Sequence, residues 1–160
     1  ASAWCGCEPA EPAPGHRLAS TATRMTDEAL AARLQPLVDH PLHRALGIED
    51  VRSQDGAGHL AIVVGGISCS PVGGLHGGVI YLLSDVCAMV GLLSRLPAGA
   101  HAVTHDIQVS VMRSAALGER VSFQSHIVQL GRRLCFCEVL VRSGERTLAT
   151  AKVTKSLLQP

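Results

Sequence analysis

The segment Ser70–Asp85 holds the residue types whose spacing most directly suggests chemistry. A glycine-rich loop with His76 leads into an apolar run, and Asp85 is the single charged residue between positions 77 and 94. A buried carboxylate without an evident partner is costly, and proteins keep such groups mainly where their chemistry is used. Backbone N–H groups at a helix start can bind negative charge. A helix start followed by one buried carboxylate therefore suits acyl transfer or hydrolysis.

The composition describes a chain that can bury an aliphatic core. It has 160 residues, of which 47% are hydrophobic and 17% charged, which suits one domain. Aromatic side chains are confined to Trp4, Tyr81, Phe123 and Phe136. A binder of single-stranded nucleic acid needs stacking platforms and a positive groove, whereas this chain has few aromatics and a formal net charge of +1. We therefore expect neither a nucleic-acid nor a membrane partner.

Six cysteines stand at positions 5, 7, 69, 87, 135 and 137. No apolar leader with a charged start and a small-residue cleavage site is visible, so we expect a cytoplasmic protein with reduced thiols. The pairs Cys5/Cys7 and Cys135/Cys137 lack the two-residue gap that is usual for zinc. The sequence therefore predicts no metal site.

The helices and strands that position this segment can be predicted from turn-forming and helix-capping residues and from the spacing of apolar residues. Residues 1–24 are rich in Ala, Pro, Gly and Ser, which predicts a disordered tail, and residues 25–160 are expected to form a single domain. An acidic start at Thr26 predicts a helix, and Pro41 interrupts it before a short second helix. We expect strands over 48–54 and 58–64, joined at Asp55-Gly56, and a long helix over 76–96.

The rest of the chain is strand-like. Residues 102–112 alternate, which predicts Val103, His105 and Ile107 on one face of a strand and Thr104 on the other. Three further strands over 120–130, 133–142 and 146–158 predict an antiparallel meander. An all-round apolar helix must be covered on every face, and one sheet covers one side. We therefore expect a second subunit or extra elements on the other side.

Several motifs within residues 41–158 resemble one known family. They are Leu75-His76-Gly77-Gly78 with Asp85 nine residues after the histidine, Val103–Ile107, Met112–Ala115 and Ala149–Thr154. Together they resemble the hotdog-fold acyl-CoA thioesterases of the phenylacetate-pathway (PaaI-like) type. The resemblance implies an α+β fold, with an antiparallel sheet wrapped around a long central helix. It also implies a homodimer or a dimer of dimers (a homotetramer).

The resemblance also implies roles for individual residues. Asp85 would activate a water or attack the thioester carbonyl, the Gly77 N–H would stabilise the oxyanion, and Thr104 would hold the carboxylate or the water. His76 would shape the loop and hydrogen-bond near the thioester. Ser70 stands where many relatives have Asn; because its hydroxyl is shorter, we expect it to act through a water or to tune the rate or the substrate.

The implied substrate is an acyl-CoA, with no cofactor beyond the coenzyme A that it carries. Gly78 belongs to the same loop motif and is expected beside the substrate. Arg113, Arg132 and Arg133 lie at turns, and arginines suit phosphate groups, so we expect them at the coenzyme A phosphates unless they are ordinary surface residues.

Helix geometry adds a constraint on this site. Gly77 and Asp85 are eight residues apart, which is about 12 Å along a helix. An attacking group must lie within roughly 3–3.5 Å of the carbonyl carbon that it attacks. One chain therefore cannot easily supply both groups to one thioester, whereas two antiparallel helices about a two-fold axis can.

Other readings of these residues stay open. Asp85 can be a structural carboxylate that caps a helix or pairs with an arginine, and His76 can simply bond loop carbonyls. The glycines can serve close packing, Thr104 can be an ordinary sheet residue, and His126, like His105, can be a surface histidine.

The function also has alternatives. A non-catalytic binding module for acyl-CoA or acyl-carrier protein fits the same fold, and a hotdog hydratase or dehydratase would need a different loop pattern. The Gly-x-Ser-x-Gly elbow and the phosphate-binding loops are absent. The sequence does not specify the acyl group, which can be aliphatic, aryl-acetyl or benzoyl-type.

Overall fold

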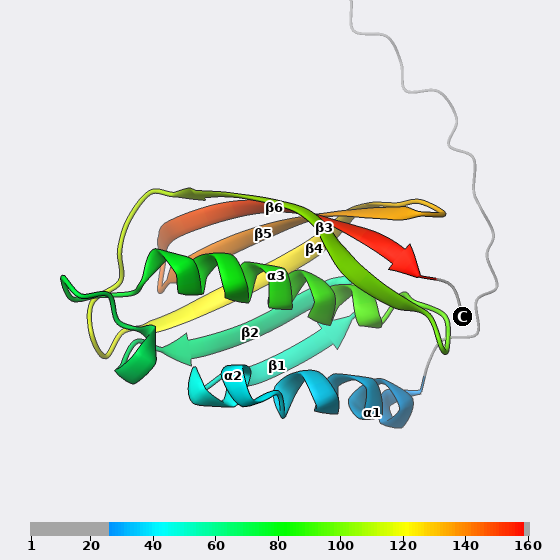
Figure 1. The fold of residues 1–160 in the computed structure, drawn as a ribbon, viewed down its shortest axis with the longest axis horizontal. Helices are drawn as coiled ribbons and strands as arrows, with labels where there is room; N and C mark the ends of the chain where they lie inside the picture. Colours follow the sequence, from blue (N-terminus) through cyan, green and yellow to red (C-terminus); the bar gives the residue numbers. More distant parts are fainter. Residues whose placement is uncertain (1–25, 159–160) are drawn as a thin grey trace, which may run out of the picture.

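The structure, a computed structural model, describes residues 26–158, so the predicted tail at residues 1–24 lies outside the described residues. Two helices and a β-hairpin come first, a long helix follows, and four strands complete the fold (Figure 1), in the order that the sequence predicts. The elements are α1 (Asp27–Val38), α2 (Pro41–Ala45), β1 (Glu49–Gln54), β2 (Ala57–Val63), η1 (Gly66–Ser68), α3 (Gly77–Leu93), β3 (His101–Val111), β4 (Arg120–Leu130), β5 (Leu134–Ser143) and β6 (Arg146–Leu158).

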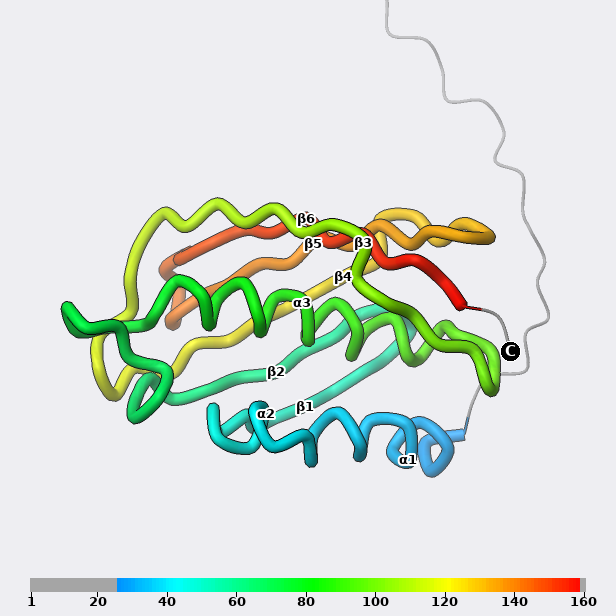
Figure 2. The backbone as a smooth tube through the Cα atoms, viewed as in Figure 1, coloured from blue at the N-terminus to red at the C-terminus, as the bar shows by residue number. Residues whose placement is uncertain are grey.

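All six strands form one antiparallel sheet in the order β1-β2-β4-β5-β6-β3. The predicted meander is its β4-β5-β6 part, and β1 and β3 are the two edges. Helix α3 crosses one face of the sheet, and α1 and α2 lie beside β1 (Figure 2). No helix in the described part of the chain is long and apolar enough to cross a membrane.

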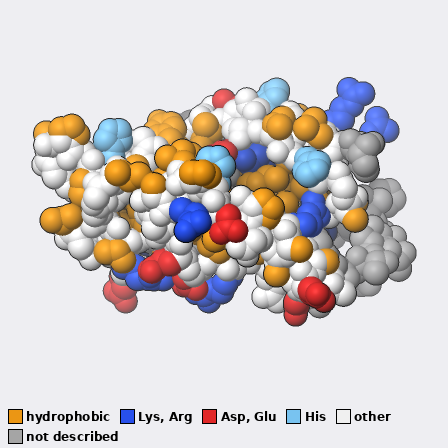
Figure 3. Space-filling view, turned by 60° about the horizontal axis from the view of Figure 1, so that its bottom comes forward, with side chains coloured by type: hydrophobic (Ala, Val, Ile, Leu, Met, Phe, Trp, Pro, Cys, Tyr) orange, Lys and Arg blue, Asp and Glu red, His pale blue; other side chains and the backbone are white. Residues whose placement is uncertain are grey.

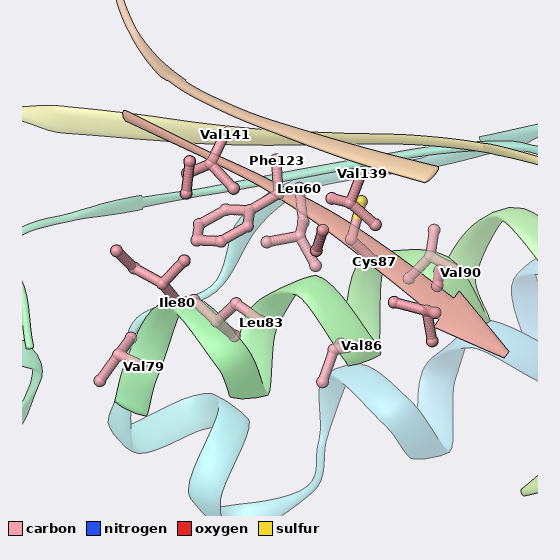
Figure 4. Packing of buried hydrophobic residues seen from close by; sticks show 14 of the residues in the cluster. Leu60, Val79, Ile80, Leu83, Val86, Cys87, Val90, Phe123, Val139 and Val141 are labelled. Carbon is pink, nitrogen blue, oxygen red and sulfur yellow. The ribbon is translucent and has the colours of Figure 1, made fainter. Parts of the chain in front are cut away.

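The core lies between α3 and the sheet, and it is aliphatic as predicted. From the sheet, Leu60, Phe123 and Val141 point toward Ile80 and Leu83 of α3 (Figure 4). Phe123 is the one aromatic side chain that is fully buried among the described residues. Each Å² of apolar surface that is buried stabilises a fold by about 25 cal/mol. The packing of α3 on the sheet is therefore the main stabilising interaction of this fold.

Helix α1 covers a second side of α3 and is one of the extra elements that the sequence requires. The Arg33 guanidinium donates hydrogen bonds to the carbonyl oxygens of Leu96 and Ala100, each at 2.8 Å. Carbonyl groups at the end of a helix have no partners within that helix, so Arg33 satisfies acceptors at the α3 terminus and just beyond it.

One stripe of α3 stays uncovered. Gly77 and Tyr81 are exposed, and Asp85 and Met89 are half-buried, so the stripe recurs every four residues along the helix. This is the spacing of side chains on one helix face. The protomer thus buries α3 on every side except the one that carries the candidate catalytic residues.

Strand β3 departs from the predicted alternation. Thr104 pairs with Lys155 and Asp106 with Thr154, so His105 is an extra residue in a β-bulge. Ile107 consequently packs against the core while Val103 is exposed, and the prediction that these two share a face is wrong. The same bulge places Thr104 on the face of the sheet that α3 covers.

The close crossing of α3 and β2 depends on glycines. A Cβ at Gly91 would lie 2.8 Å from the Gly56 carbonyl oxygen and 2.8 Å from the Gly58 nitrogen. Both atoms belong to the backbone and cannot rotate away, so a methyl group there would force the helix off the sheet.

We predict that Gly91→Ala lowers the free energy of unfolding by about 1–3 kcal/mol, the usual cost of overpacking. The backbone clash should outweigh the gain in helix propensity of about 1 kcal/mol. Urea denaturation measures the change. Gly65→Ala is the control, because a Cβ at Gly65 meets nothing within 4 Å and the backbone there is extended. Equal stability of both variants would show that the crossing has room for a methyl group.

Candidate active site

The start of α3 offers one free backbone donor. His76 caps the helix, and its Nδ1 accepts a hydrogen bond from the Gly78 N–H at 2.9 Å. A neutral imidazole that accepts at Nδ1 carries its proton on Nε2. The Gly77 N–H forms no hydrogen bond with any residue of 26–158. Of the two glycines it is therefore Gly77 whose N–H can bind an oxyanion, and the helix dipole favours negative charge there.

The loop before α3 holds this start in place. The Leu75 N–H donates to the Ala115 carbonyl and the His76 N–H to the Ser68 carbonyl, both at 2.8 Å. Ser70 closes a turn, because its Oγ donates to the Gly73 carbonyl at 2.7 Å. No hydrogen bond joins Ser70 to His76 or Asp85 in the described structure, so its hydroxyl acts within the loop.

Asp85 has two partners. Thr104 donates from its Oγ1 to Asp85 Oδ1 at 2.7 Å, and Lys155 donates from its Nζ to the same oxygen at 2.7 Å. Lys155 also donates to Thr104 Oγ1 at 3.0 Å. The expectation that Asp85 lacks an evident partner is wrong, and the partner is a lysine rather than an arginine.

Sequence reasoning missed Lys155, although β6 carries a signal for it. Ala149, Ala151 and Val153 alternate along β6 and are buried, and Lys155 takes the next inward position. Its side chain is 3% exposed, whereas that of Asp85 is 30% exposed. A lysine that ends an apolar stripe on a strand must find an anionic partner in the core. That rule, applied together with the single charge of α3, could have paired the two residues.

A pair of thiols lies next to Lys155. Cys135 pairs with Lys155 across β5 and β6, and its Sγ lies 3.6 Å from that of Cys137. The hydrogen bond from Cys137, helped by the charge of Lys155, lowers the pKa of Cys135; the same hydrogen bond and burial raise the pKa of Cys137. Burial raises the pKa of Cys87 to about 12. Cys5 and Cys7 lie outside the described residues.

The three arginines do not gather around Asp85. Arg132 and Arg133 line a hollow of about 740 Å³ with Leu134, Ser156 and Leu157. Arg113 lies after β3 and donates to the Thr147 carbonyl at 3.0 Å. Another hollow, of about 1060 Å³, lies over the sheet face away from α3, and none of the predicted site residues lines it.

One protomer therefore presents two half-sites on one stripe of α3. The free N–H of Gly77 stands at the first turn, and Asp85 with its partners stands two turns further along. The rise between them is about 12 Å, as the spacing predicts.

Comparisons with known proteins address the family and the fold. Residues 72–150 match the family model described as the thioesterase superfamily. Human acyl-coenzyme A thioesterase 13 is 31% identical over 88 residues, which is 54% of this chain and 62% of that protein. The chain thus matches less than two thirds of the length of this curated relative.

Solved structures share the fold. Thioesterase HI1161 from Haemophilus influenzae has a TM-score of 0.73 and 23% identity, over 84% of this chain and 92% of that one. A mutant of the phenylacetic acid degradation protein PaaI from Thermus thermophilus has a TM-score of 0.67 and 26% identity, over 73% of this chain and 98% of that one. A Streptococcus pneumoniae thioesterase protein solved with coenzyme A has a TM-score of 0.65 and 22% identity, over 72% and 89%.

The fold and the helix-start motif define a hotdog domain, as the sequence predicts. Over residues 72–150, a little under half of its length, the chain is similar to the thioesterase superfamily.

We predict that Asp85→Ala lowers the free energy of unfolding by about 1–3 kcal/mol, because it leaves the buried Lys155 ammonium without its anionic partner. Asp85→Asn keeps an oxygen acceptor and should lose less. Chemical denaturation measures both. The double variant Asp85→Ala/Lys155→Met removes both charges and should regain part of the loss. If Asp85→Ala were as stable as the parent protein, the ion pair would not contribute to the fold.

Proposed function

We propose that this protein hydrolyses acyl-CoA thioesters to a free acid and coenzyme A, with Asp85 as the catalytic carboxylate. The observation that carries the proposal is the hydrogen bonding of the two Asp85 carboxylate oxygens. Its Oδ1 accepts from both Thr104 and Lys155, while no residue of 26–158 bonds its Oδ2. That oxygen belongs to a half-exposed side chain on the open stripe of α3. The family match and the thioesterase relatives, one of them solved with coenzyme A, support the same chemistry.

In this mechanism Asp85 Oδ2 takes a proton from a water whose oxygen attacks the thioester carbonyl. The carbonyl oxygen becomes an oxyanion that the Gly77 N–H binds. Collapse of the intermediate breaks the C–S bond, and the proton on Asp85 passes to the leaving thiolate. Alternatively, Oδ2 attacks the carbonyl itself, the thiolate leaves, and water then hydrolyses the anhydride. The His76 Nε2–H can donate to the substrate at the loop in either case.

Two protomers are needed to assemble this site. The Gly77 N–H and Asp85 of one chain lie two turns apart, so we place Gly77 of one protomer opposite Asp85 of the other, about a two-fold axis. Strand β3 supports this arrangement, because within residues 26–158 it pairs with β6 alone and leaves a long free edge. Dimers of this kind can pair again into a dimer of dimers.

The proposed dimer would cover apolar side chains that are exposed in the protomer. Figure 3 shows hydrophobic side chains gathered in several groups, with charged side chains gathered mainly along the lower edge of the view. Exposed apolar residues on the α3 side include Tyr81 on α3 and Val111 on β3. Contiguous apolar patches, rather than single exposed side chains, mark surfaces that a partner covers.

For the substrate, the expected contacts are Gly78 beside the acyl thioester and the arginines at phosphate groups. Arg132 and Arg133 share one hollow and suit a phosphate-bearing ligand better than Arg113, whose guanidinium bonds the Thr147 carbonyl. Ser70 would act by holding the loop turn.

The first test of this proposal is turnover. We predict that the parent protein hydrolyses members of a panel of short-chain, long-chain, phenylacetyl and hydroxybenzoyl-CoA, and that Asp85→Asn lowers kcat by about 100-fold or more. Chromatographic separation of the products is the measurement, because the six cysteines would react with a thiol dye.

The outcomes separate the two functions that fit the fold. Turnover that survives in Asp85→Asn would remove the carboxylate from the mechanism. Saturable binding of acyl-CoA without turnover by the parent protein would instead favour a non-catalytic binding module. The same panel offered on acyl-carrier protein distinguishes the carrier.

The dimer register can be tested with Tyr81, which is the single tyrosine of the chain. If Gly77 faces the partner's Asp85 on antiparallel helices, the midpoint residue 81 faces itself at the two-fold axis. We predict that photo-oxidation yields a dityrosine-linked dimer, which persists on a reducing gel and is seen by its fluorescence, and that Tyr81→Phe yields none. A dimer in solution that never forms the link would show a different helix register.

A further inference from the structure

We propose that Lys155 is a positioning residue for Asp85: it fixes Oδ1 and so makes Oδ2 the reacting oxygen. This inference rests on the proposed hydrolase function and deepens it. None of the motifs quoted in the sequence analysis includes Lys155, which lies 70 residues from Asp85 in the chain.

The contacts form a closed triangle. Lys155 Nζ donates to Asp85 Oδ1 at 2.7 Å and to Thr104 Oγ1 at 3.0 Å, and Thr104 donates its own proton to Asp85 Oδ1 at 2.7 Å. Because the ammonium has only protons to give, it fixes the direction of the Thr104 hydroxyl. Two donors then hold one carboxylate oxygen, and the rotation that would exchange Oδ1 and Oδ2 is blocked.

The three groups come from three elements that the core holds rigidly. Asp85 lies in the middle of α3, Thr104 sits beside the β3 bulge, and Lys155 lies on β6, where it pairs directly with Thr104. The bulge matters here, because without it the alternation of β3 could not place both Thr104 and Ile107 toward α3. Such a frame can hold a reacting atom within a fraction of an ångström.

Stability alone does not account for a lysine at this position. The inward positions before it on β6 are Ala149, Ala151 and Val153, and a fourth apolar residue would continue the core. Buried ion pairs are often no more stabilising than apolar residues of the same volume. Lys155 is 3% exposed and its charge faces the carboxylate, so what the lysine adds is a fixed, charged neighbour for Asp85.

The test is steady-state kinetics of Lys155→Met, which keeps the length of the side chain and removes the ammonium. We expect kcat to fall about 10- to 100-fold, because small misplacements of a reacting group cost this much, with KM changed by less than about threefold. Lys155→Arg keeps a charged donor and should retain more of kcat than Lys155→Met.

Lys152→Met is the matched control. Lys152 lies on the same strand, is exposed, and faces away from α3, where it pairs with Glu138 across the sheet. Its kcat should equal that of the parent protein. If Lys155→Met does not fold, Lys155→Gln gives the comparison, since its neutral side chain is one bond shorter and does not reach the Nζ position that holds Oδ1; we then expect a loss of kcat with KM preserved.

The results distinguish this inference from the proposed function. A parent protein without turnover, or Asp85→Asn with full turnover, would contradict the function itself. An active parent protein and an inactive Asp85→Asn, combined with parental kcat in folded Lys155→Met or Lys155→Gln, would overturn the role of Lys155 alone. Equal losses of kcat in Lys152→Met and Lys155→Met would also overturn it.

Discussion

The structure depends on one constraint, the burial of an apolar helix. Helix α3 has almost no polar face, so it must be covered on every side. The six-stranded sheet covers one side, and α1, tied down by Arg33, covers another. The α3–β2 crossing requires glycines, because the two backbones approach too closely there for a Cβ atom. The remaining uncovered stripe is therefore the surface that a partner or a substrate must occupy.

The two candidate catalytic groups of the protomer lie along that stripe. The free N–H of Gly77 stands at one end, and Asp85, held by Thr104 and Lys155, stands two turns away. The sheet contributes to the site through the β3 bulge and the last inward position of β6. Burial of α3 thus does two things: it stabilises the fold, and it fixes one carboxylate against a rigid frame with one oxygen left free.

Local patterns predicted most of this arrangement. Three short-range signals placed the elements in the right order. They are the glycine-rich loop before α3, the single charged residue within α3, and the hairpin turns. The sequence could not show the bulge at His105, because one extra residue in a strand leaves no compositional mark. It also could not pair Asp85 with Lys155, since that contact joins residues 70 positions apart and depends on how β6 packs. The sequence also could not show that the Ser70 hydroxyl closes a turn within the loop, because that depends on the loop's path.

The central proposal is that each site joins the Gly77 N–H of one protomer to Asp85 of the other, and mixing two inactive variants tests it most directly. Gly77→Pro removes the N–H at the first helical position, where proline is tolerated and where the backbone of His76 is already extended. Asp85→Asn removes the carboxylate. A hybrid of the two has one intact site only if the site is shared, so co-expression in equal amounts should restore about a quarter of the parental turnover. A mixture as inactive as either variant alone, with hybrids demonstrably formed, would show that each chain works with its own two groups.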